Sequence, residues 1–373
     1  MSVEVGGRFK CLPRFQLETI VLVLLISPSL INGAKCILFN FGDSNSDTGG
    51  LMAGLGLYLG PPAGRQFFHR TTGRFCDGRL YIDFLCEGLK IKFLSPYMES
   101  SGSDYTNGVN FAVAGTATDA NGIPFPLSTQ VLQFLHFKNR TRGLFPQGSG
   151  SMISEKGFQN AVYSFDMGQN DIATPLNANS SYSQVIETTP AILSRIEDAI
   201  LNVYNNGGKK FLIYNTGPLG CLPQKLALQQ QIYSELDSYG CLAAHNNVSK
   251  AFNTGLSVLL DQLNSQYTNA TFVYVDIFRI KYDLVANHTK YGIDNPLMAC
   301  CGFGGPPYNY VFRKTCGEPN VQPCSNASRY LSWDGVHNTE AANSIIASKI
   351  LSGKYSKPPD QVTDSLQSLI PSP

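Results

Sequence analysis

The sequence predicts an α/β protein with a central parallel sheet and helices on both faces. Short apolar runs recur along the chain, and each one ends in glycine or polar residues. Segments with a helical repeat of apolar residues separate these runs. Apolar residues make up 43% of the 373 positions, which is enough for a large core. Strands that alternate with helices form parallel sheets, and such sheets bind ligands at the carboxyl ends of their strands.

Four apolar runs are expected to be strands: Ile37–Phe41, Ala161–Phe165, Lys210–Asn215 and Thr271–Val275. The first run stops at Gly42-Asp43-Ser44, and the second is followed closely by Gly168-Gln169-Asn170-Asp171. Both polar segments follow strand ends, so we expect them on the same rim of the sheet.

Helices are expected over Thr189–Asn205, over Ser234–Tyr267 with a possible break at Gly255, and from a Thr339 cap through Ile350. No internal repeat or long linker divides the chain. One domain is therefore predicted for residues 35–354, followed by a polar, proline-containing tail over residues 355–373.

Residues 1–34 resemble a secretory signal peptide. Basic residues precede the apolar run Ile20–Ile31, and small residues follow it near Ala34. A signal anchor is the alternative, but the run is short and Pro28 interrupts it. The chain is therefore expected to be secreted to the extracellular space or cell wall, without stable membrane insertion after cleavage.

Six Asn-x-Ser/Thr sequons agree with export: Asn139, Asn179, Asn247, Asn269, Asn287 and Asn326. Each is a candidate glycosylation site. The small net charge of +1 and the 15% of charged residues argue against a polyanion-binding surface. Nucleic acid is therefore not an expected partner.

The ten cysteines also suit an exported protein. Cys11 would leave with the signal, and the odd number that remains leaves one thiol without a partner. Plausible local pairs are Cys76 with Cys86 and Cys221 with Cys241. Four more cysteines cluster between residues 300 and 324, where a disulfide-stapled loop is favoured over a zinc site because no histidine lies among them. Sequence alone does not assign the pairings.

Ser44 is a candidate nucleophile because a strand that ends in a tight turn presents the next side chain at the edge of the sheet. A serine hydroxyl needs a base, and the base needs a group that orients it. Of the five histidines, only His337 follows an aspartate, Asp334, by three residues within a glycine-containing turn. Surface turns are the alternative interpretation of both segments.

Acyl transfer also needs donors for the tetrahedral oxyanion. The Ser44 N–H, the N–H of Gly115 and the side-chain amide of Asn170 are the candidates. Taken singly, Gly115 could be a packing glycine and Asn170 a turn former.

Four segments in this order resemble the sequence blocks of the plant GDSL esterase/lipase family of SGNH hydrolases: Gly42-Asp43-Ser44, Asn110–Gly115, Gly168–Asp171 and Asp334–His337. The segment Gly73–Arg79 also resembles a loop of that family. The resemblance implies a flavodoxin-like three-layer α/β/α fold and ester hydrolysis without metal or organic cofactor. It also implies roles for particular residues: Ser44 as nucleophile, His337 as base, Asp334 as its orienting partner, and Ser44, Gly115 and Asn170 as the oxyanion hole.

The predicted function is therefore that of a secreted serine esterase that works through an acyl-enzyme. No long apolar lid is evident, and the loops mix polar residues with aromatic ones such as Tyr58, Phe67 and Tyr310. This favours short-acyl, for example acetyl, esters of carbohydrates such as cell-wall polysaccharides, or of plant metabolites. A long-chain lipase, an acyltransferase that uses the same acyl-enzyme and a catalytically silent protein are the alternatives.

Overall fold

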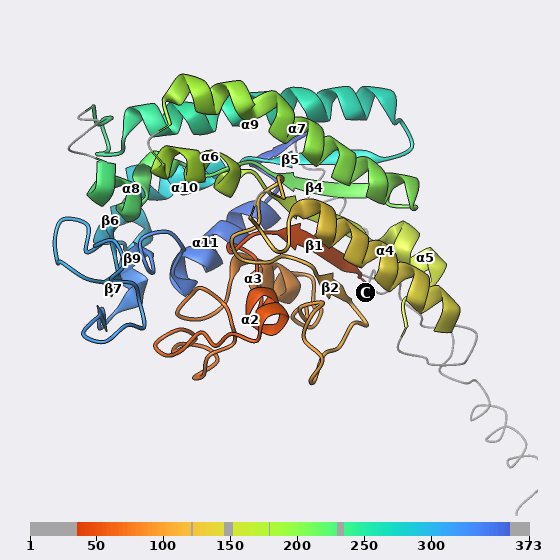
Figure 1. Ribbon diagram of the computed structural model, residues 1–373, viewed down its shortest axis with the longest axis horizontal. Helices are drawn as coiled ribbons and strands as arrows, with labels where there is room; N and C mark the ends of the chain where they lie inside the picture. The colour runs from red at the N-terminus through yellow and green to blue at the C-terminus, as the bar shows by residue number, and fades with distance from the viewer. Residues whose placement is uncertain (1–35, 121, 145–151, 179, 230–234, 359–373) are drawn as a thin grey trace, which may run out of the picture.

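The computed structural model describes residues 36–120, 122–144, 152–178, 180–229 and 235–358. Its centre is a six-stranded sheet in the order β10-β5-β4-β3-β1-β2 (Figure 1). All neighbouring strands are parallel except β10, which is antiparallel to β5. The strands are β1 (Leu38–Gly42), β2 (Gly108–Asn110), β3 (Val162–Asp166), β4 (Lys210–Tyr214), β5 (Thr271–Val275) and β10 (Ser356–Lys357). The predicted fold class is confirmed.

Helices cover both faces of this sheet (Figure 1). One face carries α4 (Leu127–Leu144), α5 (Glu155–Asn160), α6 (Gln169–Asn177), α7 (Tyr182–Asn205) and α9 (Ala243–Gln266). The other face carries α3 (Tyr81–Gly88), α10 (Ile277–Ala286) and α11 (Glu340–Leu351). Two shorter helices, α2 (Gly50–Leu55) and α8 (Pro223–Gln229), lie near the carboxyl ends of the strands.

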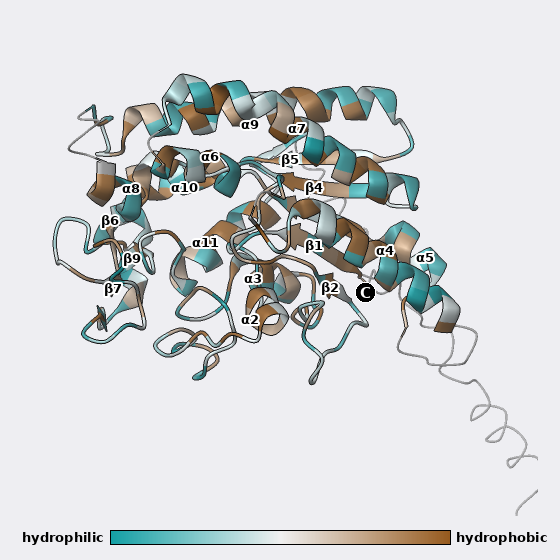
Figure 2. Ribbon diagram, in the orientation of Figure 1, coloured by the Kyte–Doolittle hydropathy of each residue, from teal (hydrophilic) through white to brown (hydrophobic). Residues whose placement is uncertain are grey.

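Side chains that alternate along each strand build a separate apolar core on each face. Phe39 and Phe41 of β1 pack with α4, α7 and α9, whereas Leu38 packs with α3 and α11. The central strands are predominantly apolar in Figure 2, whereas the outer helices carry more polar residues. Burial on both faces explains why these strands are continuous apolar runs in the sequence.

The four predicted strands are confirmed to within one residue at each end. β2 and β10 were not predicted, because each is too short to show a pattern. β10 corrects the expected start of the tail, since Ser356 and Lys357 pair with β5 instead of leaving the domain. The predicted signal peptide, the sequon at Asn179 and residues 359–373 of the tail lie outside the described residues.

The long helix expected from Ser234 is shorter at its start and is not interrupted. α9 begins at Ala243 and passes through Gly255 without a break. Gly255 marks close packing between helices, because a methyl group there would lie 2.6 Å from Leu193 Cδ1 of α7. α11 is confirmed, and Thr339 caps it by accepting a hydrogen bond from Ala342 N.

The described part of the chain contains three disulfides: Cys221–Cys241, Cys300–Cys324 and Cys301–Cys316. The expected stapled loop is therefore confirmed, and so is the Cys221–Cys241 pair. The Cys76–Cys86 pair was wrong, because both thiols are free and buried. The Cys76 thiol lies 3.5 Å from Asn343 Nδ2 of α11, whereas Cys86 lies in α3 near Cys36.

Outside the central sheet, two small sheets support the loop that carries Asp334 and His337. β6 (Asn295–Ala299) pairs with β9 (Tyr330–Ser332), and β7 (Cys301–Gly302) pairs with β8 (Gln322–Pro323). The described residues also form 3₁₀ turns at Leu219–Cys221, His288–Tyr291 and Ala327–Arg329. Within the described ranges, no helix is both long and apolar enough to cross a membrane.

Candidate active site

Ser44 lies just beyond the carboxyl end of β1. β1 is an interior strand of the sheet. β1 is the strand at which the sheet order reverses, since β2 lies on one side of it and β3 on the other. Ligands bind at such switch points in open α/β sheets. Ser44 is 7% exposed, and a hydrogen bond of 3.2 Å from Ser46 N to Asp43 O closes the turn around it. A methyl group at Gly42 would lie 2.5 Å from Ser46 Oγ, so the turn requires glycine there.

Asp47 connects the Ser44 turn to the segment around Gly115. One carboxylate oxygen accepts a hydrogen bond from Gly49 N at 2.7 Å, and the other accepts one from Ala114 N at 2.8 Å. The first bond belongs to the start of α2, and the second fixes the residue before Gly115. This role was not predicted, although an aspartate just before the Gly49-Gly50 start of a helix is a recognisable capping signal.

Gly115 faces open space in a left-handed conformation. Its φ is +80°, and a methyl group there would meet no atom within 4 Å. Gln130 of α4 holds this segment against the end of β1, because its Nε2 donates to Gly42 O at 2.8 Å and to Thr116 Oγ1 at 3.0 Å. The backbone at Gly115 is thus both fixed and accessible.

Asn170 stands in the first turn of α6, just after β3. Its Nδ2 donates to Thr116 O at 2.9 Å and to Asp43 Oδ2 at 3.3 Å. The next residue, Asp171, accepts hydrogen bonds from Thr118 N at 2.8 Å and Thr118 Oγ1 at 2.6 Å. The structure therefore brings the first three sequence blocks together. An oxyanion bound to Asn170 would compete with the longer and weaker bond, the one to Asp43.

Asp334 and His337 form a hydrogen-bonded pair within one turn. Asp334 Oδ2 lies 2.6 Å from His337 Nδ1, while Asp334 Oδ1 accepts the backbone N–H groups of Val336 and His337 at 3.0 and 2.8 Å. One carboxylate oxygen thus shapes the turn and the other orients the imidazole. Burial opposes ionisation of Asp334, but the charge and hydrogen bonds of His337 hold its pKa below the usual range.

Asp43, Asp166 and Lys281 link the Ser44 turn electrostatically to the Asp334–His337 pair. Burial, and then the neighbouring Asp166, raises the pKa of Asp43 to about 7. Lys281 of α10 interacts with both of these carboxylates. Burial disfavours the imidazolium of His337, yet Asp334 and Asp43 outweigh it and raise the pKa of His337, while Lys281 acts in the opposite direction. The ionisation of Asp43, the neighbour of Ser44, is therefore coupled to the charge of His337.

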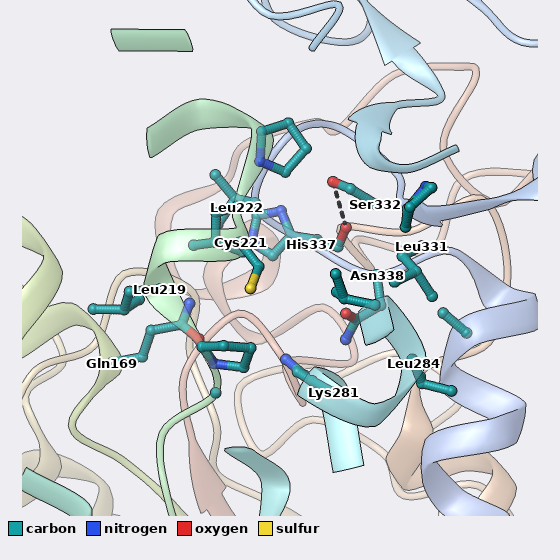
Figure 3. Close-up of a pocket in the computed structure, with 17 residues that line it drawn as sticks. Gln169, Leu219, Cys221, Leu222, Lys281, Leu284, Leu331, Ser332, His337 and Asn338 are labelled. Carbon is teal, nitrogen blue, oxygen red and sulfur yellow. Dashed lines mark hydrogen bonds between the residues drawn. The ribbon is translucent and has the colours of Figure 1, made fainter. Parts of the chain in front are cut away.

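A cavity of about 50 Å³ lies beside His337 (Figure 3). Lys281 and Leu284 of α10, Leu331 of β9 and Gln169 line it together with His337. Figure 3 also shows the hydrogen bond of 3.3 Å from Ser332 Oγ to the backbone oxygen of His337. The cavity has room for a few water molecules. Ser44, Gly115 and Asn170 are not among its lining residues.

A buried histidine, His245, makes its contacts within another part of the structure. His245 is buried in α9 with Tyr182 3.2 Å from its Nδ1, and burial together with Lys225 lowers its pKa to about 4. Among the described residues, no group of three His, Cys, Asp or Glu side chains is placed to hold a metal ion.

Comparison with known proteins identifies the family. The model of the family "GDSL-like Lipase/Acylhydrolase" matches residues 38–350. The chain belongs to the GDSL esterase/lipase family. GDSL family members are ester hydrolases, and we assign carboxylic ester hydrolysis to this chain.

Relatives match over most of their length. GDSL esterase/lipase LIP-4 from Arabidopsis thaliana is 49% identical over 351 residues, which covers 92% of this chain and 93% of the relative. The Arabidopsis thaliana protein named Alpha-L-fucosidase 3 is 39% identical over 336 residues, which covers 85% of this chain and 90% of the relative. The crystal structure of a lipase named Lip_vut3, from a goat rumen metagenome, aligns with 86% of this chain and 98% of its own at 13% identity. The TM-score of this alignment is 0.37.

Proposed function

We propose that this GDSL esterase is a secreted serine hydrolase in which Ser44 is the nucleophile, His337 the base and Asp334 its orienting partner. The observation that carries the proposal is the Asp334–His337 pair at 2.6 Å. The charge of Asp43, the residue before Ser44, contributes to the raised pKa of His337. A carboxylate on Nδ1 leaves Nε2 of the neutral imidazole free to accept a proton.

In the proposed reaction, Ser44 Oγ attacks the ester carbonyl carbon as His337 accepts its proton. The tetrahedral intermediate collapses, and His337 returns the proton to the departing alcohol. Water then attacks the acyl-enzyme with His337 again as base, which releases the acid and regenerates Ser44. The N–H groups of Ser44 and Gly115 and the amide of Asn170 would stabilise the oxyanion in both steps.

Short acyl groups on carbohydrate or metabolite alcohols are the proposed substrates. The loops mix polar residues with aromatic ones such as Tyr58, Phe67 and Tyr310, which suit the faces of sugars. The name of one relative, Alpha-L-fucosidase 3, refers to a sugar, which agrees with a carbohydrate alcohol. Five predicted glycosylation sites are exposed, as an exported glycoprotein requires: Asn139, Asn247, Asn269, Asn287 and Asn326.

The test is Ser44→Ala in the purified protein, with p-nitrophenyl acetate as substrate. Turnover should fall by about 10⁶-fold because no other nucleophile forms the acyl-enzyme. Ser46→Ala is the matched control, since Ser46 lies in the same turn; it should keep most of the activity. Turnover by Ser44→Ala at the wild-type rate would rule out the assignment.

Substrate choice needs a separate comparison. Acetate release from acetylated xylan should exceed hydrolysis of p-nitrophenyl palmitate. The reverse preference would make this protein a long-chain lipase instead. Adding an acceptor alcohol and analysing the products would reveal acyl transfer if the acyl group appeared on the alcohol.

A further inference from the structure

Phe75 lies against the imidazole of His337. The centroids of the two rings are 5.1 Å apart, and their planes make an angle of 33°. The two rings are therefore tilted toward each other, at an angle closer to parallel than to perpendicular. Phe75 belongs to the Gly73–Arg79 loop, which has no role in the reaction as described above.

The loop that carries Phe75 is anchored on both sides of the ring. Before it, Arg74 forms a buried double hydrogen bond with Asp83 of α3, at 2.7 and 2.9 Å. After it, Asp77 accepts a hydrogen bond of 2.7 Å from Glu340 N, at the start of α11. α11 begins three residues after His337. The same contacts therefore fix the loop with Phe75 and the helix that follows the histidine.

We propose that Phe75 is a positioning residue for His337. Its ring keeps the imidazole in the plane set by Asp334, and its π face stabilises the imidazolium that forms when His337 accepts a proton. Cations within about 6 Å of an aromatic centroid are stabilised in this way. The inference rests on the proposed function, because it requires His337 to act as the base.

The charged neighbours of His337 define the expected pH effect. Asp334 on its own loop and Asp43 after β1 raise the pKa of His337, while burial and Lys281 of α10 lower it. Arg74, beside Phe75 in the loop, is paired with Asp83. Loss of the ring would remove a stabiliser of the charged form. Activity requires the neutral imidazole, so the acid limb of the pH–rate profile should move to lower pH.

The experiment compares Phe75→Leu with Phe68→Leu. Phe68 lies in a neighbouring part of the chain and packs on the guanidinium of Arg74 at 4.7 Å. For Phe75→Leu we expect kcat for p-nitrophenyl acetate to fall by about two- to thirtyfold with little change in KM, together with the shifted acid limb. Phe68→Leu should leave the acid limb in place. An acid limb at the same pH in wild type and Phe75→Leu would overturn the proposal. The same shift of the acid limb in Phe68→Leu would also overturn it.

A fluorinated phenylalanine at position 75 provides a second test that preserves packing. Fluorine weakens the negative π face while nearly keeping the shape of the ring, so the acid limb should again move to lower pH. An unmoved limb in this variant would overturn the proposal even if Phe75→Leu does not fold. The Ser44→Ala variant separates the two hypotheses. If it is inactive while the position-75 variants match wild type, only the role of Phe75 fails.

Discussion

Ser44 and Asn170 stand at the ends of neighbouring strands of the central sheet, whereas Asp334 and His337 stand on a loop outside it. The sheet-borne part is held by hydrogen bonds among its own sequence blocks. Asn170 bonds to Asp43 and Thr116, and Gln130 joins Thr116 to Gly42. The order of the strands therefore determines most of its geometry.

The loop-borne part depends on contacts from distant segments. Arg65 lies over the Trp333 ring at 5.2 Å and donates to Cys324 O at 2.8 Å, within the disulfide-stapled loop. Tyr310, from the same loop, packs on Gly335, where a methyl group would lie 2.4 Å from its ring. This part of the site is thus assembled by side chains that are far apart in the sequence. The difference teaches that one site can combine the edge of a sheet, which the strand order positions, with a loop that contacts from distant segments position.

Among the variants that probe this comparison, Asp334→Asn should give the largest effect and break the loop-borne part alone. An amide neither stabilises the imidazolium nor favours the correct tautomer, so kcat should fall by about 10⁴-fold. The measurement is kcat for p-nitrophenyl acetate, with the melting temperature as a check on folding. A loss below tenfold in a folded variant would contradict the role of Asp334.

Asn170→Ala should have the next largest effect, this time in the sheet-borne part. Loss of one oxyanion donor costs about 10²- to 10³-fold in kcat. The variant also loses the bond to Thr116, so a control is needed. Thr118→Ala removes another tie between the same segments, the 2.6 Å bond to Asp171, without touching an oxyanion donor. An equal loss of kcat in both variants would show that Asn170 acts only as an anchor.

The strands of the central sheet were predicted well from the sequence, because strands buried on both faces are largely apolar runs. Phe39 and Phe41 on one face and Leu38 on the other make β1 such a run. β2 is only three residues long, and β10 is defined by its pairing with β5, so neither has a local signal. The start of α9 was placed too early because the helical pattern of its sequence extends beyond the helix itself.

The site was predictable only where residues close together in the sequence form a recognisable pattern. The pairing of Asp334 with His337 follows from a spacing of three in a turn. The roles of Asp47, Gln130 and Phe75 follow instead from contacts across more than sixty residues, which a single sequence does not reveal. Cys76 and Cys86 show the converse error: short separation suggested a disulfide, but the thiol of Cys76 points to α11.

Lys281→Met should have the smallest effect, and it tests the coupling between the two parts. Lys281 interacts with Asp43 and Asp166 on the sheet side and lowers the pKa of His337 on the loop side. Without its charge, the pKa of His337 should rise further. The neutral base would then be available only at higher pH, so the acid limb should move to higher pH, opposite to the shift expected for Phe75→Leu.

The loss of kcat/KM for Lys281→Met at neutral pH should stay within about tenfold, since one pH unit along the limb changes the fraction of neutral imidazole tenfold. Lys281→Arg, which keeps the charge, should restore the limb. Lys225→Met is the matched control: Lys225 is buried, and burial lowers its pKa to about 8, but it bonds to Ala173 O and not to a carboxylate of the site. A limb that moves equally in both methionine variants would mean that loss of stability, not charge, couples the sheet edge to the loop.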